Sequence, residues 1–169
     1  MAFKGTTKYY SNMQEREVAE EVRGRVVIAS GALDDKGDVR SDNFLIECKT
    51  TEKKEYTFRA GVWLKLRSEA YKLGLTPVVN IDLKSRYGER YRLAIMREED
   101  FFSYAQNTLF SLDERKKKNR KIISWNKSLK ISDEDWSYAK LVSPYIEEEC
   151  GDTLLIFPWE SFLIISQVV

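Results

Sequence analysis

The chain has 169 residues with a formal net charge of +1, although 33% of them are charged, and it contains no histidine. The lack of histidine excludes Ser-His-Asp and Cys-His catalysis and histidine-ligated zinc. Any hydrolysis must therefore use carboxylates, lysine, tyrosine, or a metal that prefers oxygen ligands, such as Mg²⁺ or Mn²⁺. A net charge this close to zero means that any basic surface for nucleic acid must be local.

The first predicted element is a helix over residues 14–22, which follows a loose N-terminal lead-in. Glu15, Val18 and Val22 have the spacing of one helix face, so we expect a carboxylate at a position that faces the core. A short buried strand is predicted over residues 26–29, and a polar loop that contains glycine follows it.

Two short strands joined by a polar turn over residues 41–43 come next. Alternation along the second strand places Glu47 and Lys49 on one face and turns Cys48 into the packing layer. Asp38, on the first strand, is expected across the hairpin from them. Two carboxylates and an ammonium could hold a divalent metal and activate water against a phosphodiester. The simpler alternative for Glu47 and Lys49 is a surface ion pair, which contributes little to stability.

Hydrophobic periodicity and turn residues predict the next elements. They are an extended segment at 56–58, a helix over 61–73 closed by Gly74, strands over 77–83 and 91–96, and a helix over 97–106. Val62, Leu66 and Tyr71 are expected on the buried side of the longer helix. A basic run over residues 115–121 is either a solvated linker or a segment that contacts a nucleic acid.

The C-terminal third partly repeats an earlier part of the sequence. Residues 154–162 resemble residues 93–101, and residues 127–136 resemble residues 54–63. The likeness is either a degenerate repeat or a chance match between two amphipathic units. The second unit has no counterpart of the acidic hairpin, so we expect it to be an accessory and not a second active site.

Several of these motifs together resemble the PD-(D/E)xK nuclease superfamily, and most closely the archaeal-type Holliday junction resolvases and their phage-encoded relatives. The residues and segments that carry the resemblance are Glu15-Arg16-Glu17, Ser30-Gly31, Asp38, Glu47-Cys48-Lys49-Thr50, and the helix and Pro-Val-Val strand within 61–83. The resemblance covers about residues 12–100. It departs from the superfamily pattern at Gly37, which stands where a proline often precedes the first acid.

The resemblance implies an α/β fold of the restriction-endonuclease-like kind, in which helices flank a mixed central β-sheet, here with an appended C-terminal αβ segment. We expect a nuclease core over residues 1–108, a basic linker or DNA-contacting segment over 109–125, and an accessory αβ unit over 126–169 that is a possible degenerate repeat of 54–106.

The resemblance also implies a role for each residue of the hairpin. Asp38 and Glu47 would hold one or two Mg²⁺ (or Mn²⁺) ions, with the carbonyl of Cys48 as a further ligand. Lys49 would position the attacking water or stabilise the transition state. Glu15 would complete the metal site directly or through water. Asp42 is the alternative first acid, but its place in a turn is explained by turn chemistry alone.

The basic and polar residues near the hairpin and in the basic run suit contacts with DNA phosphates. Those expected to bind DNA are Arg16, Ser30, Lys36, Arg40, Lys53, Lys54, Lys116, Lys117 and Lys118. No feature of the sequence indicates readout of bases, so recognition of the shape of a branched duplex is the favoured interpretation.

The favoured function is a metal-dependent endonuclease that resolves four-way DNA junctions by paired symmetrical cuts, which requires two active sites and hence a homodimer. The alternatives are another nuclease of this superfamily in repair or restriction, a non-catalytic DNA-binding module and, last, a structural scaffold. No signal peptide, lipidation motif or apolar run long enough to span a membrane is visible. We therefore expect a cytoplasmic protein, in the host cytoplasm if phage-encoded, without membrane contacts.

Overall fold

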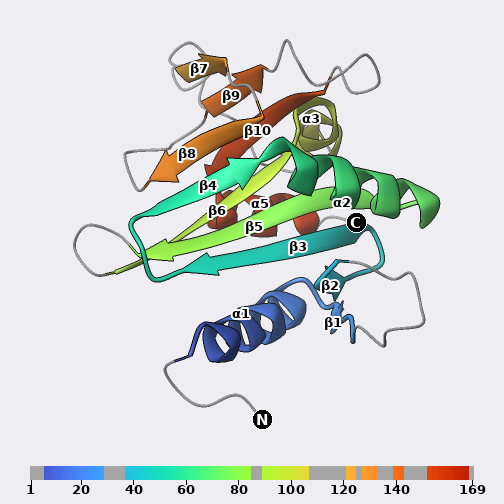
Figure 1. Ribbon diagram of the computed structural model, residues 1–169. Coiled ribbons are helices and arrows are strands. Elements are labelled where there is room, and N and C mark those ends of the chain that lie inside the picture. The colour runs from blue at the N-terminus through green and yellow to red at the C-terminus, as the bar shows by residue number, and fades with distance from the viewer. Residues whose placement is uncertain are drawn as a thin grey trace.

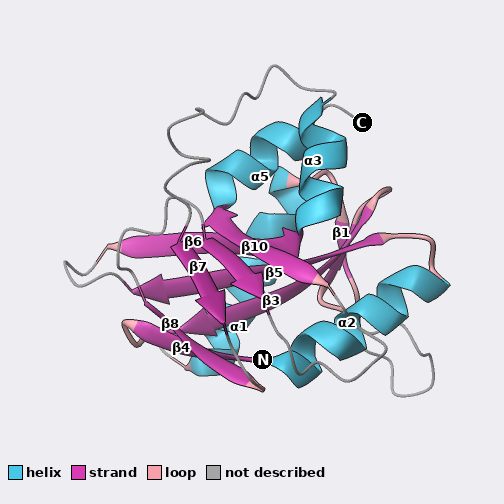
Figure 2. Ribbon diagram, turned by 90° about the horizontal axis from the view of Figure 1, so that it is seen from above, coloured by secondary structure: helices cyan, strands magenta, loops and turns pink. Residues whose placement is uncertain are grey.

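The computed structural model describes residues 6–28, 37–84, 89–106, 121–124, 127–132, 139–142 and 152–167. These residues form a mixed eight-stranded sheet with helices on both faces (Figures 1 and 2) and a separate two-stranded sheet. The predicted α/β class, with helices flanking a mixed central sheet, is therefore confirmed. No helix in these ranges is long and apolar enough to cross a membrane.

The helices are α1 (Thr7–Glu21), α2 (Ala60–Lys72), α3 (Glu98–Gln106) and α5 (Trp159–Ser166). The strands of the N-terminal part are β1 (Arg25–Val26), β2 (Val39–Arg40), β3 (Phe44–Thr51), β4 (Glu55–Arg59), β5 (Thr76–Lys84) and β6 (Arg90–Arg97). Those of the C-terminal part are β7 (Lys121–Ser124), β8 (Ser128–Ser132), β9 (Ala139–Val142) and β10 (Thr153–Pro158). The order in the large sheet is β1-β2-β3-β5-β6-β10-β9-β7, and β4 pairs with β8 in the small one.

Helix α1 begins earlier than the sequence suggested, so the predicted loose lead-in is wrong from Thr7 onward. The hydroxyl of Thr6 accepts a hydrogen bond from the Tyr9 N–H (3.3 Å), which caps the first turn. The fully buried face of the helix carries Gln14 and Val18, whereas Glu15 is only half-buried. The expectation that Glu15 faces the core is therefore wrong, because the core-facing residue is its neighbour Gln14.

The predicted hairpin is confirmed as β2 and β3. Val39 pairs with Ile46, and the turn is closed by the Ser41 N–H, which donates to the Phe44 carbonyl at 3.0 Å. The strand predicted over 26–29 is wrong in extent, because β1 ends at Val26 and Ile28 is 86% exposed. Because β1 is so short, the acidic hairpin of β2 and β3 forms most of this edge of the large sheet.

Helix α2 confirms the helix predicted over 61–73, and Gly74, at a φ of +68°, closes it in the left-handed region. The predicted buried side was correct for Leu66 but wrong for Tyr71, which is 44% exposed. The buried residues of the helix are Ala60, Trp63, Leu66 and Ala70.

The sheet has a hydrophobic core on each face. On one face α2 and the small sheet pack against the large sheet through Phe58, Trp63, Leu66, Ile81, Ile95, Ile131 and Ile156. On the other face α1, α3 and α5 contribute Val18, Phe101, Trp159 and Phe162, which pack on Ile46, Val78, Met96 and Phe157. Figure 2 shows α3 and α5 together on one side of the sheet and α2 on the other. Because it is covered on both faces, β5 is buried over residues 77–83.

Strands β7, β9 and β10 of the C-terminal part continue the same large sheet, because β10 pairs with β6 in antiparallel orientation. In Figure 1 these strands, in orange and red, extend the sheet beyond the green strands of the N-terminal part. The division of the chain into a core, a basic segment and an accessory unit stays a prediction. Residues 109–120 of the predicted basic segment lie outside the described residues.

Candidate active site

Asp38, Glu47 and Lys49 lie together at the edge of β3, next to the first residue of β2. The Asp38 N–H donates to the Ile46 carbonyl at 3.0 Å, and the Asp38 Oδ2 accepts a hydrogen bond from the Cys48 N–H at 2.7 Å. Asp38 directly precedes Val39, the partner of Ile46, and its carboxyl is close enough to Glu47 for the charge of Glu47 to raise its pKa. The side chain of Asp38 thus takes the place that a further residue of β2 would occupy beside β3.

Glu47 and Lys49 lie on the same face of β3, as the alternation of the sequence predicted. The Lys49 Nζ donates to Glu47 Oε1 at 2.5 Å. The two side chains are only 30% and 20% exposed, for Lys49 and Glu47 respectively. The ion pair is therefore partly buried and lies beside a third charged group, Asp38, which an isolated surface ion pair would not require.

Burial and neighbouring charges both act on the carboxyl of Asp38. Burial, together with the charges of Glu47 and Glu15, raises the pKa of the Asp38 carboxyl to about 6, against the opposing effects of the Cys48 N–H and Lys49. Burial by itself would lower the pKa of Lys49, but the hydrogen bond and charge of Glu47 outweigh this effect and raise it. Lys49 is therefore protonated at neutral pH, and among the described residues at the site it faces the carboxyl groups of Asp38 and Glu47.

Cys48 contributes its backbone to this edge and its side chain to the core. Within a strand the N–H and C=O of one residue point to the same edge, so the Cys48 carbonyl points toward Asp38, as its N–H does. The thiol is buried, and burial raises its pKa well above the usual value. The predicted part of Cys48 in a metal site is thus compatible with its carbonyl and not with its sulfur.

A third direct carboxylate ligand is not assembled. The Glu15 Oε1 accepts a hydrogen bond from the Ser11 hydroxyl at 3.1 Å. The negative charge of Glu15 acts on Asp38 by raising the pKa of its carboxyl. Among the described residues no three Asp, Glu, Cys or His side chains converge to hold a metal. Mg²⁺ often uses one or two carboxylates and keeps several waters, so Asp38 and Glu47 fit such an ion. A contribution of Glu15 through water stays a prediction.

The other predicted residues are spread more widely. Asp42 is exposed in the turn at the far end of the hairpin, so the structure brings Asp38 and not Asp42 to Glu47. Arg16, Lys53 and Lys54 are exposed, and Arg40 is half-buried in β2. Ser30, Lys36, Lys116, Lys117 and Lys118 lie outside the described residues. Contact of any of these residues with DNA remains a prediction.

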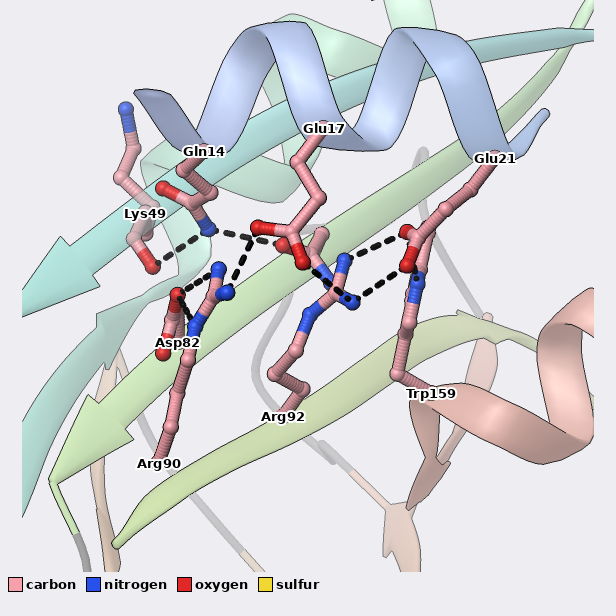
Figure 3. A network of polar contacts seen from close by, with 9 residues as sticks. Gln14, Glu17, Glu21, Lys49, Asp82, Arg90, Arg92 and Trp159 are labelled. Atoms are coloured by element: carbon pink, nitrogen blue, oxygen red, sulfur yellow. Dashed lines mark hydrogen bonds and ion pairs between the residues drawn. The ribbon is translucent and has the colours of Figure 1, made fainter. Parts of the chain in front are cut away.

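Sequence reasoning missed Gln14, which connects α1 to the strand that carries the site. The Gln14 Nε2 donates to the Lys49 carbonyl at 3.1 Å and to the Asn80 Oδ1 at 2.7 Å (Figure 3). Gln14 and Asn80 are 1% and 0% exposed. Gln14 lies four residues before Val18, on the same helix face, and this spacing is the signal that could have identified it.

A neighbouring network ties α1 to β5, β6 and α5 (Figure 3). Its members are Glu17, Glu21, Asp82, Arg90, Arg92 and Trp159. Both Glu21 oxygens accept hydrogen bonds from the Arg92 guanidinium at 2.7 Å, and the Trp159 indole N–H donates to Glu21 at 2.9 Å. Burial would raise the pKa of Glu21, but these hydrogen bonds outweigh it and lower the pKa. Each carboxylate of this network has an arginine partner.

Comparison with solved structures finds remote likenesses, one of which is to a DNA-processing enzyme. The structure is similar to that of Hjc, a Holliday junction resolvase from the archaeal hyperthermophile Archaeoglobus fulgidus, with a TM-score of 0.36 and 18% sequence identity. The likeness covers 46% of this chain and 70% of that one. No protein-family model and no curated protein matches the sequence. A likeness at this level does not place the chain in a family.

Proposed function

We propose that the chain is a metal-dependent endodeoxyribonuclease that acts on branched DNA and resolves four-way junctions. The observation that carries the proposal is the position of Asp38, whose carboxylate is held by the Cys48 N–H, largely buried, and close enough to Glu47 for the charge of Glu47 to raise its pKa. Carboxylates in this state suit a divalent cation, and they stand in the order and spacing in which the sequence resembles the PD-(D/E)xK nucleases.

Each residue of the site has a role in this proposal. Asp38, Glu47 and the Cys48 carbonyl would hold Mg²⁺ or Mn²⁺, which when bound supplies an activated water and neutralises charge on the scissile phosphate. Lys49 is held protonated by Glu47 and can donate to a phosphate oxygen as negative charge develops. Glu15 would act through water.

Resolution of a junction requires two symmetrical cuts and therefore two copies of this site. The described residues of one chain contain a single Asp38–Glu47–Lys49 group. A homodimer with two-fold symmetry would supply the second copy, and it is part of the proposal. A cytoplasmic location, in the host cytoplasm if a phage encodes the chain, belongs to the proposal as well.

The test compares labelled four-way junctions with linear duplexes of the same arm sequences, in Mg²⁺ and in EDTA. We expect Mg²⁺-dependent paired nicks on the junction. Lys49→Met should lower the single-turnover rate by about 100- to 1000-fold, because it removes one charged donor from the transition state, while binding is retained. Lys72→Met, at an exposed lysine of α2, is the matched control.

Each outcome of this test leads to a different conclusion. Equal cutting of the linear duplex would keep the nuclease and remove the selectivity for junctions, which favours a role in repair or restriction. Binding without metal-dependent cutting of any DNA would favour the non-catalytic module. If Lys49→Met cut as fast as the Lys72→Met control, the Glu47–Lys49 pair would be only a structural ion pair.

A further inference from the structure

Six of the eight strands of the large sheet have the same order and orientation on either side of the β6–β10 pair. In the order β3-β5-β6-β10-β9-β7, the outer pairs β3–β5 and β7–β9 are parallel. The inner pairs β5–β6 and β9–β10 are antiparallel, and β6 and β10 meet in the middle as an antiparallel pair. Helix α3 follows β6 and helix α5 follows β10, and the two helices lie together in Figure 2.

The residue pairing follows the same two-fold symmetry. At the centre of the large sheet Ile95 pairs with Ile156, and two residues away on either side Arg97 pairs with Leu154 and Leu93 with Pro158. A two-fold rotation about the Ile95–Ile156 pair exchanges Leu93 with Leu154 and Arg97 with Pro158, and the register is compatible with it. These correspondences are the ones that the repeat in the sequence suggests.

The small sheet shows the same symmetry independently. Thr57 pairs with Lys130, and two residues away on either side Glu55 pairs with Ser132 and Arg59 with Ser128. The exchange of Glu55 with Ser128 reproduces this register. In both sheets a strand of the N-terminal half thus pairs in antiparallel orientation with the strand of the C-terminal half that the sequence repeat matches to it.

The symmetry assigns a counterpart to each candidate catalytic residue on β3. From Ile95 the strand pairings lead through Val79 of β5 to Glu47 of β3. From Ile156 they lead through Ala139 of β9 to Lys121 of β7. The same path matches Lys49 with Ile123. The acid-x-lysine of the N-terminal half thus corresponds to a lysine-x-isoleucine, which cannot hold a divalent metal.

Basic character at the surface is retained in both halves. One residue before Glu55 and Ser128 stand Lys54 and Lys127, so the symmetry of the small sheet matches these two lysines. Both are exposed, and each directly precedes its strand of the small sheet. Exposed lysines at matched positions suit contacts with phosphates on two separate pieces of duplex.

We propose that the chain is an internal duplication in which the N-terminal half binds and cuts one DNA arm and the C-terminal half binds a second arm without cutting. The inference rests on the proposed nuclease function. A linear duplex occupies one half, whereas a branched DNA offers an arm to each. The second contact is then intramolecular and gains affinity through effective concentration. The duplication accounts for selectivity toward branched DNA within a single chain.

The test reverses the charge at the two matched lysines, with Lys54→Glu and Lys127→Glu. Binding to a four-way junction and to a linear duplex is measured in EDTA, so that cutting does not interfere. We expect Lys127→Glu to weaken junction binding about tenfold and to change duplex binding less than about twofold, because it removes only the second arm contact. Lys54→Glu should weaken both, and the control Lys72→Glu neither.

A second pair of variants tests the same two charges with a lower risk that the protein misfolds. Lys127 has a left-handed backbone with φ of 55°, which asparagine tolerates, so Lys127→Asn and Lys54→Asn remove the charge with less strain. Equal junction binding by wild type and both Lys127 variants, or an equal loss on junction and duplex, would overturn the duplication as a two-arm binder. Mg²⁺-dependent cutting by wild type is recorded separately, so a failure of the nuclease proposal is recognised independently.

Discussion

The network around Arg92 and the acid site around Asp38 both contain carboxylates removed from solvent, but their charges are balanced differently. In the network, Glu21 receives two hydrogen bonds from Arg92 and one from Trp159, and Arg90 joins Glu17 to Asp82 (Figure 3). Paired groups of this kind hold α1 against β5, β6 and α5. The network is therefore explained by the fold that it stabilises.

The acid site lacks this balance. Within the part of the chain that the structure describes, Lys49 is the cation that acts on both Asp38 and Glu47, and the charge of Glu15 further raises the pKa of Asp38. The raised pKa of Asp38 means that burial and the nearby negative charges make its ionised form less favourable. Native proteins violate local electrostatic rules mainly at functional sites. This contrast is the reason why we propose the acid site, and not the network around Arg92, as the ligand site.

The largest expected effect is that of Asp38→Asn on cleavage. Loss of a metal-binding carboxylate should lower the single-turnover rate by roughly 1000-fold, equivalent to about 4 kcal/mol of transition-state stabilisation. Junction binding in EDTA should remain. A rate within tenfold of wild type, from a folded variant, would remove Asp38 from the metal site and with it the contrast between the two clusters.

The same variant should make the metal-free protein more stable at pH 7.5. The folded-state pKa of Asp38, about 6, lies above its unfolded value near 3.9, so the folded state binds this proton more tightly. Stability from this group is present below about pH 4 and is lost as the pH rises to about 6. An asparagine side chain at this position avoids the loss and keeps an acceptor for the Cys48 N–H. Urea unfolding without metal should show a gain on the order of 1–2 kcal/mol.

Arg92→Met should have the opposite profile. Removing Arg92, whose side chain is 10% exposed, leaves Glu21 without its main partner and should lower the free energy of unfolding by about 3 kcal/mol. Cleavage per folded molecule should change less than about threefold, because Arg92 does not contact the acid site. Glu21→Gln in the same chain should recover part of the stability. A loss of activity without a loss of stability would place this network in the site.

The smallest expected effect is the pH dependence of metal binding. Since a metal must displace the proton of Asp38, Mn²⁺ affinity should fall about tenfold per pH unit below pH 6 and level off above it. Calorimetry of Mn²⁺ binding between pH 5 and 8 measures this, and Asp38→Asn is the control that should show weak binding without this pH dependence. Equal Mn²⁺ affinity at pH 5 and pH 7 would mean that Asp38 is not a ligand.

Local features of the site could be predicted from the sequence. Alternation along β3 placed Glu47 and Lys49 on one face, and the turn residues around Asp42 placed Asp38 across from Glu47. The register of α1 was less accessible, because neighbouring residues on a helix differ by about 100° in direction. That difference separates Gln14, which bonds the Lys49 carbonyl, from Glu15.

The sequence by itself determined the short-range geometry of the hairpin, the order of most helices and strands, and the chemistry open to a chain without histidine. Tertiary structure alone decided that β6 pairs with β10, that Glu21 meets Arg92 and Trp159, and that burial and neighbouring charges raise the pKa of Asp38. The physical reason is distance along the chain. Alternation and turns act between near neighbours, whereas strand order, burial and the pKa of a carboxyl depend on residues brought together from distant parts of the sequence.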